Sequence, residues 1–318
     1  MLIKQADDKS SSIALLSSFL ARADVPADTK QKIEVELRNM RSGLKGENDT
    51  AYEIDFSFGK SENWMLIHDL RVEHKGRVAQ IDHILINRLM EVYICESKRF
   101  CEGIAVNEQG ECATFFKGRA QGIASPFEQN KKHVLVLDTI FENEIVPVPR
   151  RLGMKITPTL ISLILVSKNA RISRPKLEFE ELSQIMKVDQ AMSWVERNAT
   201  KSISVSSLVS KLVSAKTLED FARSLASLHA PIEVDWRARF GVPATEIPML
   251  KAIKVESPPR AVPAAIISDD ITEAEASSKY ACAKCTAPLS LAIARFCWKN
   301  KRRFKGATYC MDCQNAAN

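Results

Sequence analysis

The sequence lacks any hydrophobic run long enough to cross a membrane. Its most apolar stretch, residues 160–166, is far shorter than the roughly 20 residues that a bilayer-spanning helix needs. It also lacks internal repeats, and its 45% hydrophobic and 26% charged residues are typical of an ordinary globular protein. Because single cores stop growing at about 250–300 residues, a chain of 318 residues predicts two or three modules. The short apolar runs predict that the chain has no transmembrane segment.

Residues 1–278 lack any excess of basic charge. The whole chain carries a formal charge of +6, whereas residues 279–318 hold eight basic residues and one acid, Asp312. The basic excess therefore lies entirely in this C-terminal tail. A small cationic tail on a neutral body predicts a polyanionic partner such as nucleic acid, with an anionic membrane surface as the weaker alternative.

The N-terminus carries Asp7 and Asp8 where a secretory signal peptide would be basic. Its apolar positions between residues 13 and 20 follow helical spacing, which predicts a short amphipathic helix. These features indicate a reducing, cytoplasmic setting. In that setting the paired Cys-x-x-Cys motifs of the tail favour metal binding over disulfide formation.

The order of the predicted elements is αβββαβ. Residues 30–41 have helical periodicity, Gly43 predicts a break, and Gly46-Glu47 opens a second helix that ends near Phe58. The remaining elements are three strands of an antiparallel meander, at 64–73, 77–87 and 91–100, a helix from Ser125-Pro126 to about Glu142, and a buried central strand at 159–167.

The segments around this core are less regular. Four glycines punctuate a polar insertion, at positions 103, 110, 118 and 122, which predicts loops. Residues 176–230 have helical character throughout. Five of the 13 prolines fall within 243–263, and an acidic stretch follows at 268–275. This composition predicts a poorly ordered linker.

Acidic side chains lie inside the predicted meander. Asp82 is embedded in an apolar strand, where a buried carboxylate without a partner costs several kcal/mol. If residues 88–90 form the connecting loop, Asp82 lies opposite Glu96, and Lys98 shares the face of Glu96. Two carboxylates this close repel unless a divalent cation binds between them, which suits Mg²⁺. The alternative is a solvated ion-pair network at the edge of the sheet.

The order of four short motifs resembles the nuclease-related domain (NERD) family of the PD-(D/E)xK nuclease superfamily. The motifs are Gly46-Glu47, Gln80-Ile81-Asp82-His83, Glu96-Ser97-Lys98 and Pro126-Phe127-Glu128-Gln129. The resemblance covers about residues 40–170. It implies an α/β fold with a restriction-endonuclease-like core, whose αβββαβ order agrees with the elements predicted above. The residues beyond this core predict a helical extension and a small C-terminal zinc ribbon.

The resemblance also implies roles for individual residues. Asp82 and Glu96 would bind Mg²⁺ or Mn²⁺, and Lys98 would position or activate the attacking water. Glu47 would contribute from the first helix, although a Glu at a helix start is also favourable without any chemistry. Gln129 would order the site or contact the phosphate backbone, unless it belongs to a solvated helix face. His83 faces away on an ideal strand, so we interpret it as a polar group on the opposite surface.

The tail carries two Cys-x-x-Cys motifs, at positions 282–285 and 310–313. Cys282, Cys285, Cys310 and Cys313 in this pattern predict a tetrahedral Zn²⁺ site that supplies most of the folding energy of the tail. We assign Cys297 to the small core, with a ligand role as the alternative. The predicted nucleic-acid-binding residues are Lys299, Lys301, Arg302, Arg303 and Lys305. The alternatives for this run are a solvated turn and a protein-binding surface.

Together these patterns predict a cytoplasmic, metal-dependent nuclease that does not bind membranes and prefers DNA to RNA. The alternatives are an inactive nucleic-acid-binding adaptor and a zinc-ribbon protein-interaction factor. The predicted domains are an N-terminal helical segment (1–42), a nuclease domain (43–170), a helical extension (171–242), a flexible linker (243–278) and the zinc ribbon (279–318).

Overall fold

The computed structural model describes most of the chain. The described residues are 1–100, 102–176, 180–201, 211–243, 280–289, 291–300, 304, 306–310 and 313–314. The chain divides into two compact units, Met1–Glu246 and Ile247–Asn318, and each is described by itself. Apart from Pro243, the predicted linker falls outside the described residues. The finer domain boundaries stay predictions.

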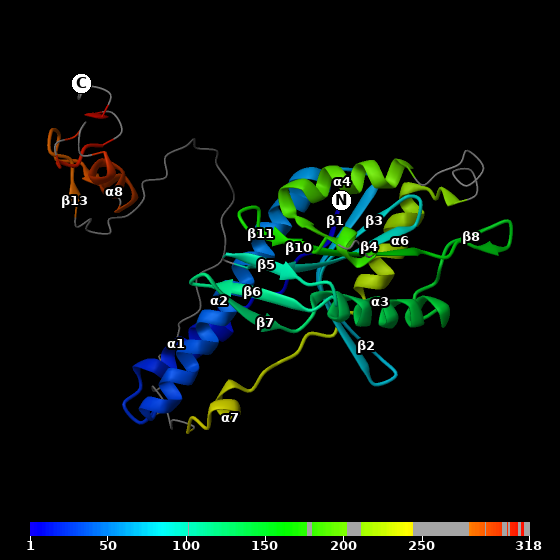
Figure 1. The fold of residues 1–318 in the computed structure, drawn as a ribbon, viewed down its shortest axis with the longest axis horizontal. Helices are drawn as coiled ribbons and strands as arrows, with labels where there is room; N and C mark the ends of the chain where they lie inside the picture. Colours follow the sequence, from blue (N-terminus) through cyan, green and yellow to red (C-terminus); the bar gives the residue numbers. More distant parts are fainter. Residues whose placement is uncertain are drawn as a thin grey trace, which may run out of the picture. The chain divides into compact units, whose positions relative to one another are not determined.

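A six-stranded mixed sheet forms the centre of the first unit (Figure 1). Its strands, in spatial order, are β1 (Leu2–Lys4), β2 (Trp64–His74), β3 (Arg77–Asn87), β4 (Glu91–Lys98), β10 (Thr159–Val166) and β12 (Ile185–Lys187). Strands β2, β3 and β4 form the predicted antiparallel meander. Strand β10 lies one position from the edge of the sheet, not at its centre as predicted, and runs parallel to its neighbours β4 and β12. The α/β class and the αβββαβ core are confirmed.

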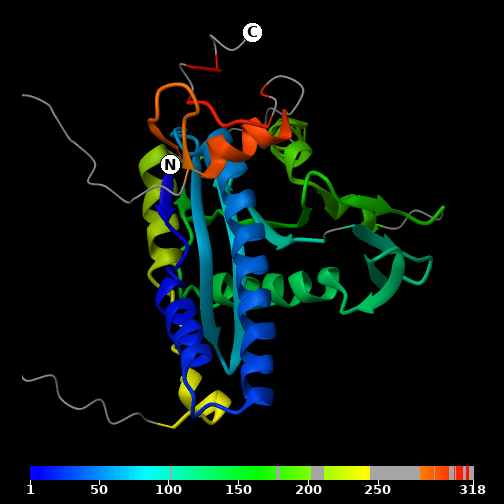
Figure 2. The ribbon, with the colours of Figure 1, turned by 90° about the vertical axis from the view of Figure 1, so that its left-hand side faces the viewer.

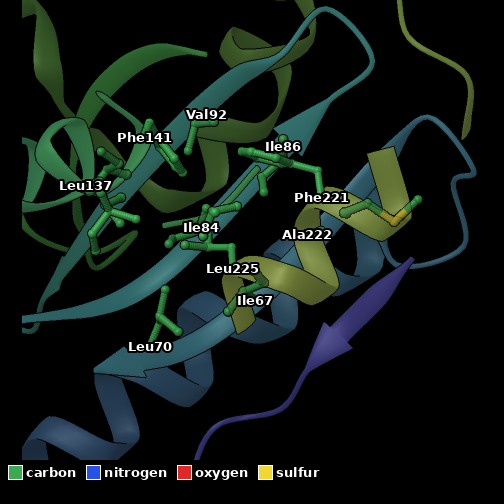
Figure 3. Close-up of a cluster of buried hydrophobic side chains, with 14 of the residues drawn as sticks. Ile67, Leu70, Ile84, Ile86, Val92, Leu137, Phe141, Phe221, Ala222 and Leu225 are labelled. Carbon is green, nitrogen blue, oxygen red and sulfur yellow. The ribbon is translucent and has the colours of Figure 1, made fainter. Parts of the chain in front are cut away.

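Helices cover both faces of the sheet. Helices α3 (Pro126–Glu142) and α6 (Ala215–Ala226) pack on one face. Figure 3 shows Leu137 of α3 and Leu225 of α6 with the strand residues Ile84 and Ile86 in this layer. Helices α2 (Ala27–Phe58) and α4 (Val188–Lys201) pack on the other face. Figure 2 shows α2 running alongside the long strands of the meander.

Shorter elements complete the first unit. They are α1 (Ser10–Ala21), β5 (Gly103–Val106), β6 (Cys112–Phe116), β7 (Arg119–Ile123), β8 (Arg150–Arg151), β9 (Met154–Lys155), β11 (Arg171–Ser173), the 3₁₀ helix η1 (Glu180–Gln184) and α7 (Trp236–Phe240). Helix α1 confirms the predicted N-terminal amphipathic helix, because its apolar side chains Leu16 and Phe19 are buried. None of the described helices is long and apolar enough to cross a membrane.

The predicted helix break at Gly43 is wrong. Helix α2 is continuous over 32 residues and passes through both Gly43 and Gly46. A glycine inside a helix costs only about 1 kcal/mol relative to alanine, and burial of apolar side chains such as Ile54 and Phe58 outweighs this cost. Gly46 has a packing role instead, since a Cβ atom there would lie 2.9 Å from the Cβ atom of Arg99.

Two other segments differ from the prediction. The glycine-punctuated insertion is not a set of loops, because β5, β6 and β7 pair with one another and β5 pairs with β11 in a four-stranded sheet. Gly110 and Gly118 have positive φ angles of 80° and 74° and occupy the turns between these strands. The segment 176–230 is not helical throughout, because β12 joins the central sheet beside β10.

The second unit is small. Among its described residues, β13 (Tyr280–Ala281) and β14 (Pro288–Leu289) form an antiparallel pair, and α8 (Leu291–Lys299) follows. The buried side chains of α8 include Ala294 and Cys297. A short strand pair that carries cysteines at its turn is typical of a zinc ribbon.

Candidate active site and zinc site

The central strands change their alternation at Asp82. Ile81 and Ile84 pack in the same core layer although they are three positions apart, so the usual alternation of side chains is interrupted between them. On the neighbouring strand, opposite this point, Asp69 has a positive φ angle of 52°. Such irregularities redirect side chains and are common beside functional sites. An acidic residue therefore lies at the point of interrupted alternation on each strand, Asp82 on β3 and Asp69 on β2.

The register that was predicted between β3 and β4 is confirmed. His83 pairs with Cys95 and Ile84 with Ile94, which aligns Asp82 with Glu96 one step beyond the last pair. The Asp82 carboxylate accepts a hydrogen bond of 2.7 Å from the backbone N–H of Ser97. Burial, and after it the charge of Glu96, raise the pKa of Asp82 well above its ordinary value. The two acids are thus neighbours that repel each other.

Glu96 is the most deeply buried acid of this group, with 3% of its side chain exposed. Its Oε1 atom accepts hydrogen bonds from Lys98 Nζ at 2.7 Å and from Gln129 Nε2 at 2.8 Å. Its Oε2 atom has no hydrogen-bond partner among the described residues. Burial raises the pKa of Glu96, and Lys98 opposes this effect. The alternative of a solvated ion-pair network is therefore wrong for Glu96.

Gln129 connects the acid to the lysine. Its Oε1 atom accepts a hydrogen bond of 3.0 Å from Lys98 Nζ, while its Nε2 atom donates to Glu96. Ser125 caps the N-terminus of α3 through the backbone N–H of Glu128, as Ser125-Pro126 predicted, and so fixes the first turn of the helix. Gln129 is exposed, but both ends of its amide are bonded to residues of β4.

Glu47 enters the group from the interior of α2, so the alternative of a helix-start residue is wrong. Its Oε2 atom lies 3.0 Å from Lys9 Nζ, and the same ammonium group lies 3.6 Å from Asp69. Burial lowers the pKa of Lys9, yet Glu47 and Asp69 together outweigh this effect and raise it. After burial, the charge of Glu47 also contributes to the raised pKa of Asp82 and of Glu96.

His133 is a member of this site that the sequence patterns did not reveal. It is buried one helical turn after Gln129, and its Nδ1 atom lies 3.7 Å from Glu96 Oε2. Burial, and then the charge of Lys98, lower its pKa to about 4, so that the imidazole is neutral at pH 7. Its spacing of four residues from Gln129 was the available signal, because such residues share a helix face.

His83 does not lie on a surface, and that interpretation is wrong. It is buried within a chain of hydrogen bonds that includes His68, another residue missed in the sequence. Ser97 Oγ lies 2.8 Å from His83 Nε2, the Nδ1 atoms of His83 and His68 lie 2.9 Å apart, and His68 Nε2 lies 3.1 Å from Asp55. One set of neutral tautomers satisfies all three bonds. The chain links α2 to the strand that carries Glu96.

Asp82 and Glu96 fit a divalent cation. They offer hard oxygen atoms, which Mg²⁺ and Mn²⁺ prefer. The buried Oε2 atom of Glu96, unpartnered among the described residues, and the raised pKa values of both acids indicate negative charge that the surrounding protein compensates incompletely. Glu47 lies close enough to influence both acids but is held by Lys9.

The four predicted zinc ligands come together in the second unit. The Sγ atoms of Cys282, Cys285, Cys310 and Cys313 all lie within 4.8 Å of one another, and those of Cys285 and Cys310 are 3.6 Å apart. Sulfur ligands at about 2.3 Å in a tetrahedron around zinc are about 3.8 Å apart. Both the donor type and the spacing therefore fit Zn²⁺.

Cys297 is not part of this cluster. It is buried, and its Sγ atom accepts hydrogen bonds from the backbone N–H of Tyr309 and from Gln314. Its assignment to the small core is confirmed. The predicted nucleic-acid-binding residues Lys301, Arg302, Arg303 and Lys305 lie outside the described residues, and so does the side chain of Lys299.

Comparison with known proteins confirms the resemblance. Residues 42–161 match the sequence profile of a family described as the nuclease-related domain, NERD. The matched segment extends from the middle of α2 into β10 and contains all five residues Glu47, Asp82, Glu96, Lys98 and Gln129. Searches of curated proteins and of solved structures found no significant match to the chain.

Proposed function

We propose that the first unit is a metal-dependent nuclease that hydrolyses phosphodiester bonds in DNA or RNA. The observation that carries the proposal is the hydrogen-bonded group formed by Glu96, Lys98 and Gln129 beside Asp82. It combines two carboxylates with an ammonium group at the end of two paired strands. The match to a nuclease-related family supports this function.

Asp82 and Glu96 would hold the divalent cation, Mg²⁺ or Mn²⁺. When bound, such a cation polarises the phosphoryl oxygen and lowers the pKa of its bound water. The Lys98 ammonium group would lie beside the attacking water and offset negative charge in the transition state. Gln129 would act as a positioning residue, because it holds both the ammonium group and Oε1 of Glu96.

The second unit would bind one Zn²⁺ through its four cysteines and hold nucleic acid through its basic residues. In this function the zinc ion is structural, since four protein thiolates leave no open coordination position. The excess of positive charge in residues 279–318 supports a nucleic-acid partner. The unit would raise the local concentration of substrate at the first unit.

The test is hydrolysis of single- and double-stranded DNA and RNA in Mg²⁺ or Mn²⁺. We expect Glu96→Gln and Asp82→Asn to abolish cleavage. Lys98→Ala should lower kcat by about 100-fold or more, the size of effect seen when a group that stabilises the transition state is removed. Lys98→Arg should not restore full activity, because a planar guanidinium does not replace a compact ammonium group.

Lys216→Ala is the matched control, because Lys216 is an exposed lysine on α6 that pairs only with the neighbouring Asp220 in the described structure. It should retain wild-type activity. Wild-type protein that cleaves none of the four substrates, or Glu96→Gln that cleaves as fast as wild type, would replace the nuclease with the adaptor. Salt-independent binding would favour the protein-interaction factor.

A further inference from the structure

A cavity of about 530 Å³ lies beside Lys98. Three of its walls follow the carboxyl ends of the adjacent strands β4, β10 and β12: Arg99 and Phe100 come after β4, residues 167–169 after β10, and Val188 after β12. One face of α2 forms the remaining wall. Because β10 is parallel to both of its neighbours, all three strands end at this edge, which is where α/β sheets usually bind ligands.

The cavity carries an excess of positive charge. Lys45, Lys98, Arg99 and Lys168 line it, against the acids Asp49 and Glu53. Lys45 lies 3.3 Å from Asp49, so its charge is largely compensated. Arg99 and Lys168 are exposed, and neither pairs with an acid among the described residues. Lys98 is paired with Glu96, and Glu53 offsets part of the charge of Arg99 and Lys168. The remaining small positive excess favours an anionic ligand.

Two exposed aromatic side chains lie one turn apart on α2, and the first of them lines this cavity. Tyr52 lines it and is 65% exposed, and Phe56, one turn further along the helix, is 80% exposed. Their rings stack with centroids 6.2 Å apart and planes inclined by 28°. A single exposed aromatic residue needs no explanation, but a stacked pair beside free cations is the combination that proteins use to bind unpaired bases.

We propose that this cavity is a subsite for single-stranded nucleic acid. Arg99 and Lys168 bind a phosphate next to the bond that is cleaved, and an unpaired base stacks on Tyr52 or Phe56. The inference rests on the proposed nuclease function and deepens it by assigning the substrate class. A base inside an intact duplex is already stacked on its neighbours and cannot reach Tyr52, so the favoured substrate is a single strand or an unpaired end.

The first test is photocross-linking of the full chain to a single strand that contains 5-iodouracil, with Ca²⁺ in place of Mg²⁺. Mass spectrometry should locate an adduct at Tyr52 or Phe56. The yield of this adduct at rising strand concentration measures the apparent affinity of the cavity, and because every variant keeps the second unit, its contribution is the same in each. Lys168→Ala should weaken that affinity and lower its salt slope by about one, whereas Lys216→Ala should not change it.

The second test is hydrolysis kinetics. Stacking contributes about 1–3 kcal/mol per base, so Tyr52→Ala should raise KM for a single strand by about 5- to 150-fold with kcat nearly unchanged. Phe116→Ala removes another exposed aromatic residue, away from the cavity lining, and should have no effect. The subsite would be overturned if hydrolysis depends on Glu96 but no adduct forms on α2 and Tyr52→Ala leaves KM unchanged. An adduct without any hydrolysis would overturn the nuclease and leave the subsite standing.

Discussion

The two units of the chain differ in how their candidate metal sites are built. The first unit has a six-stranded sheet with an apolar layer on each face, and its candidate metal site consists of two acids that repel each other. The second unit has few buried apolar side chains among its described residues, and four of its thiols are grouped together. The first unit should therefore fold without metal and need it for chemistry, whereas the second should need metal to fold at all.

The largest expected effect is loss of zinc from the second unit. Cys310→Ser or a strong chelator should unfold this unit, because zinc contributes an apparent folding free energy of about 10–16 kcal/mol in small domains of this kind. Hydrogen exchange resolved by peptide should show full exchange in residues 280–314 and unchanged protection in the central sheet. Cys297→Ser should keep one zinc per chain, because this thiol is not a ligand. If the second unit stays protected from exchange after zinc removal, it does not need zinc to fold, and the proposed difference between the two units is wrong.

The next largest effect is expected from a substitution in the apolar core of the first unit, which should lower its stability without affecting zinc binding. Leu137 is fully buried against the sheet, so Leu137→Ala should lower the free energy of unfolding of this unit by about 2–5 kcal/mol. Leu135→Ala, at a half-exposed position on the same helix, should change it by much less. Urea unfolding of the central sheet, followed by circular dichroism, measures both. The zinc content should stay constant in both variants.

A smaller effect concerns pH and the acid pair. Since the pKa of Asp82 is raised in the folded protein, the folded state binds this proton more tightly than the unfolded chain does. Without divalent cations, the free energy of unfolding should therefore fall as pH rises from about 4 through the folded pKa. Asp82→Asn should remove the part of this loss that comes from Asp82, while the part from Glu96 remains, and should be more stable than wild type at about pH 8.

Adding Mg²⁺ should make wild type more stable than Asp82→Asn at about pH 8. Wild type gains about 2.7 kcal/mol when the cation is present at about 100 times its Kd, while Asp82→Asn has lost a ligand and gains little. Thermal unfolding at about pH 5 and pH 8, with and without Mg²⁺, provides the measurement. Equal pH dependence in both proteins would show that Asp82 has an ordinary pKa.

The smallest expected effect is a difference in stability between alanine substitutions at the two glycines of α2, Gly43 and Gly46. A Cβ atom at position 43 would meet nothing closer than a Glu47 oxygen at 3.7 Å, so Gly43→Ala should stabilise the first unit by up to about 1 kcal/mol. At position 46 it would lie 2.9 Å from the Cβ atom of Arg99, so Gly46→Ala should destabilise the unit and displace Arg99 from the cavity. Denaturation midpoints distinguish the two, and equal midpoints would refute the packing role.

The sequence predicted the meander and its register because strand length, turn length and alternation are local properties. Residues 88–90 determined the alignment of Asp82 with Glu96 without any knowledge of the rest of the fold. Ser125-Pro126 determined the start of α3 in the same way, through a cap that needs only neighbouring residues. For these elements the local signals and the tertiary structure agree.

The failures have a common physical origin in contacts between distant segments. Gly43 has weak helix propensity, but packing along the whole of α2 overrides it. Strand β12 is short and forms because β10 offers it an open edge. His68 and His133 have no motif of their own, and their importance depends on His83 and Glu96 being brought beside them.

The parallel pairing of β4 with β10 has a consequence for the order of events during synthesis. The meander is complete at Lys98, whereas β10 begins only at Thr159. Local contacts form faster than distant ones, so we expect Asp82 and Glu96 to meet on a nascent three-stranded sheet that is still open to water at one edge. Pulse-labelled hydrogen exchange that found β10 protected before β3 would exclude this order.

In that order, Glu96 loses its hydration only when α3 and β10 pack beside β4. The step that completes the candidate active site is then also the step that removes water from its acids. The early meander would carry two hydrated carboxylates with little strain, and the repulsion between them would arise only as the last strands of the sheet arrive.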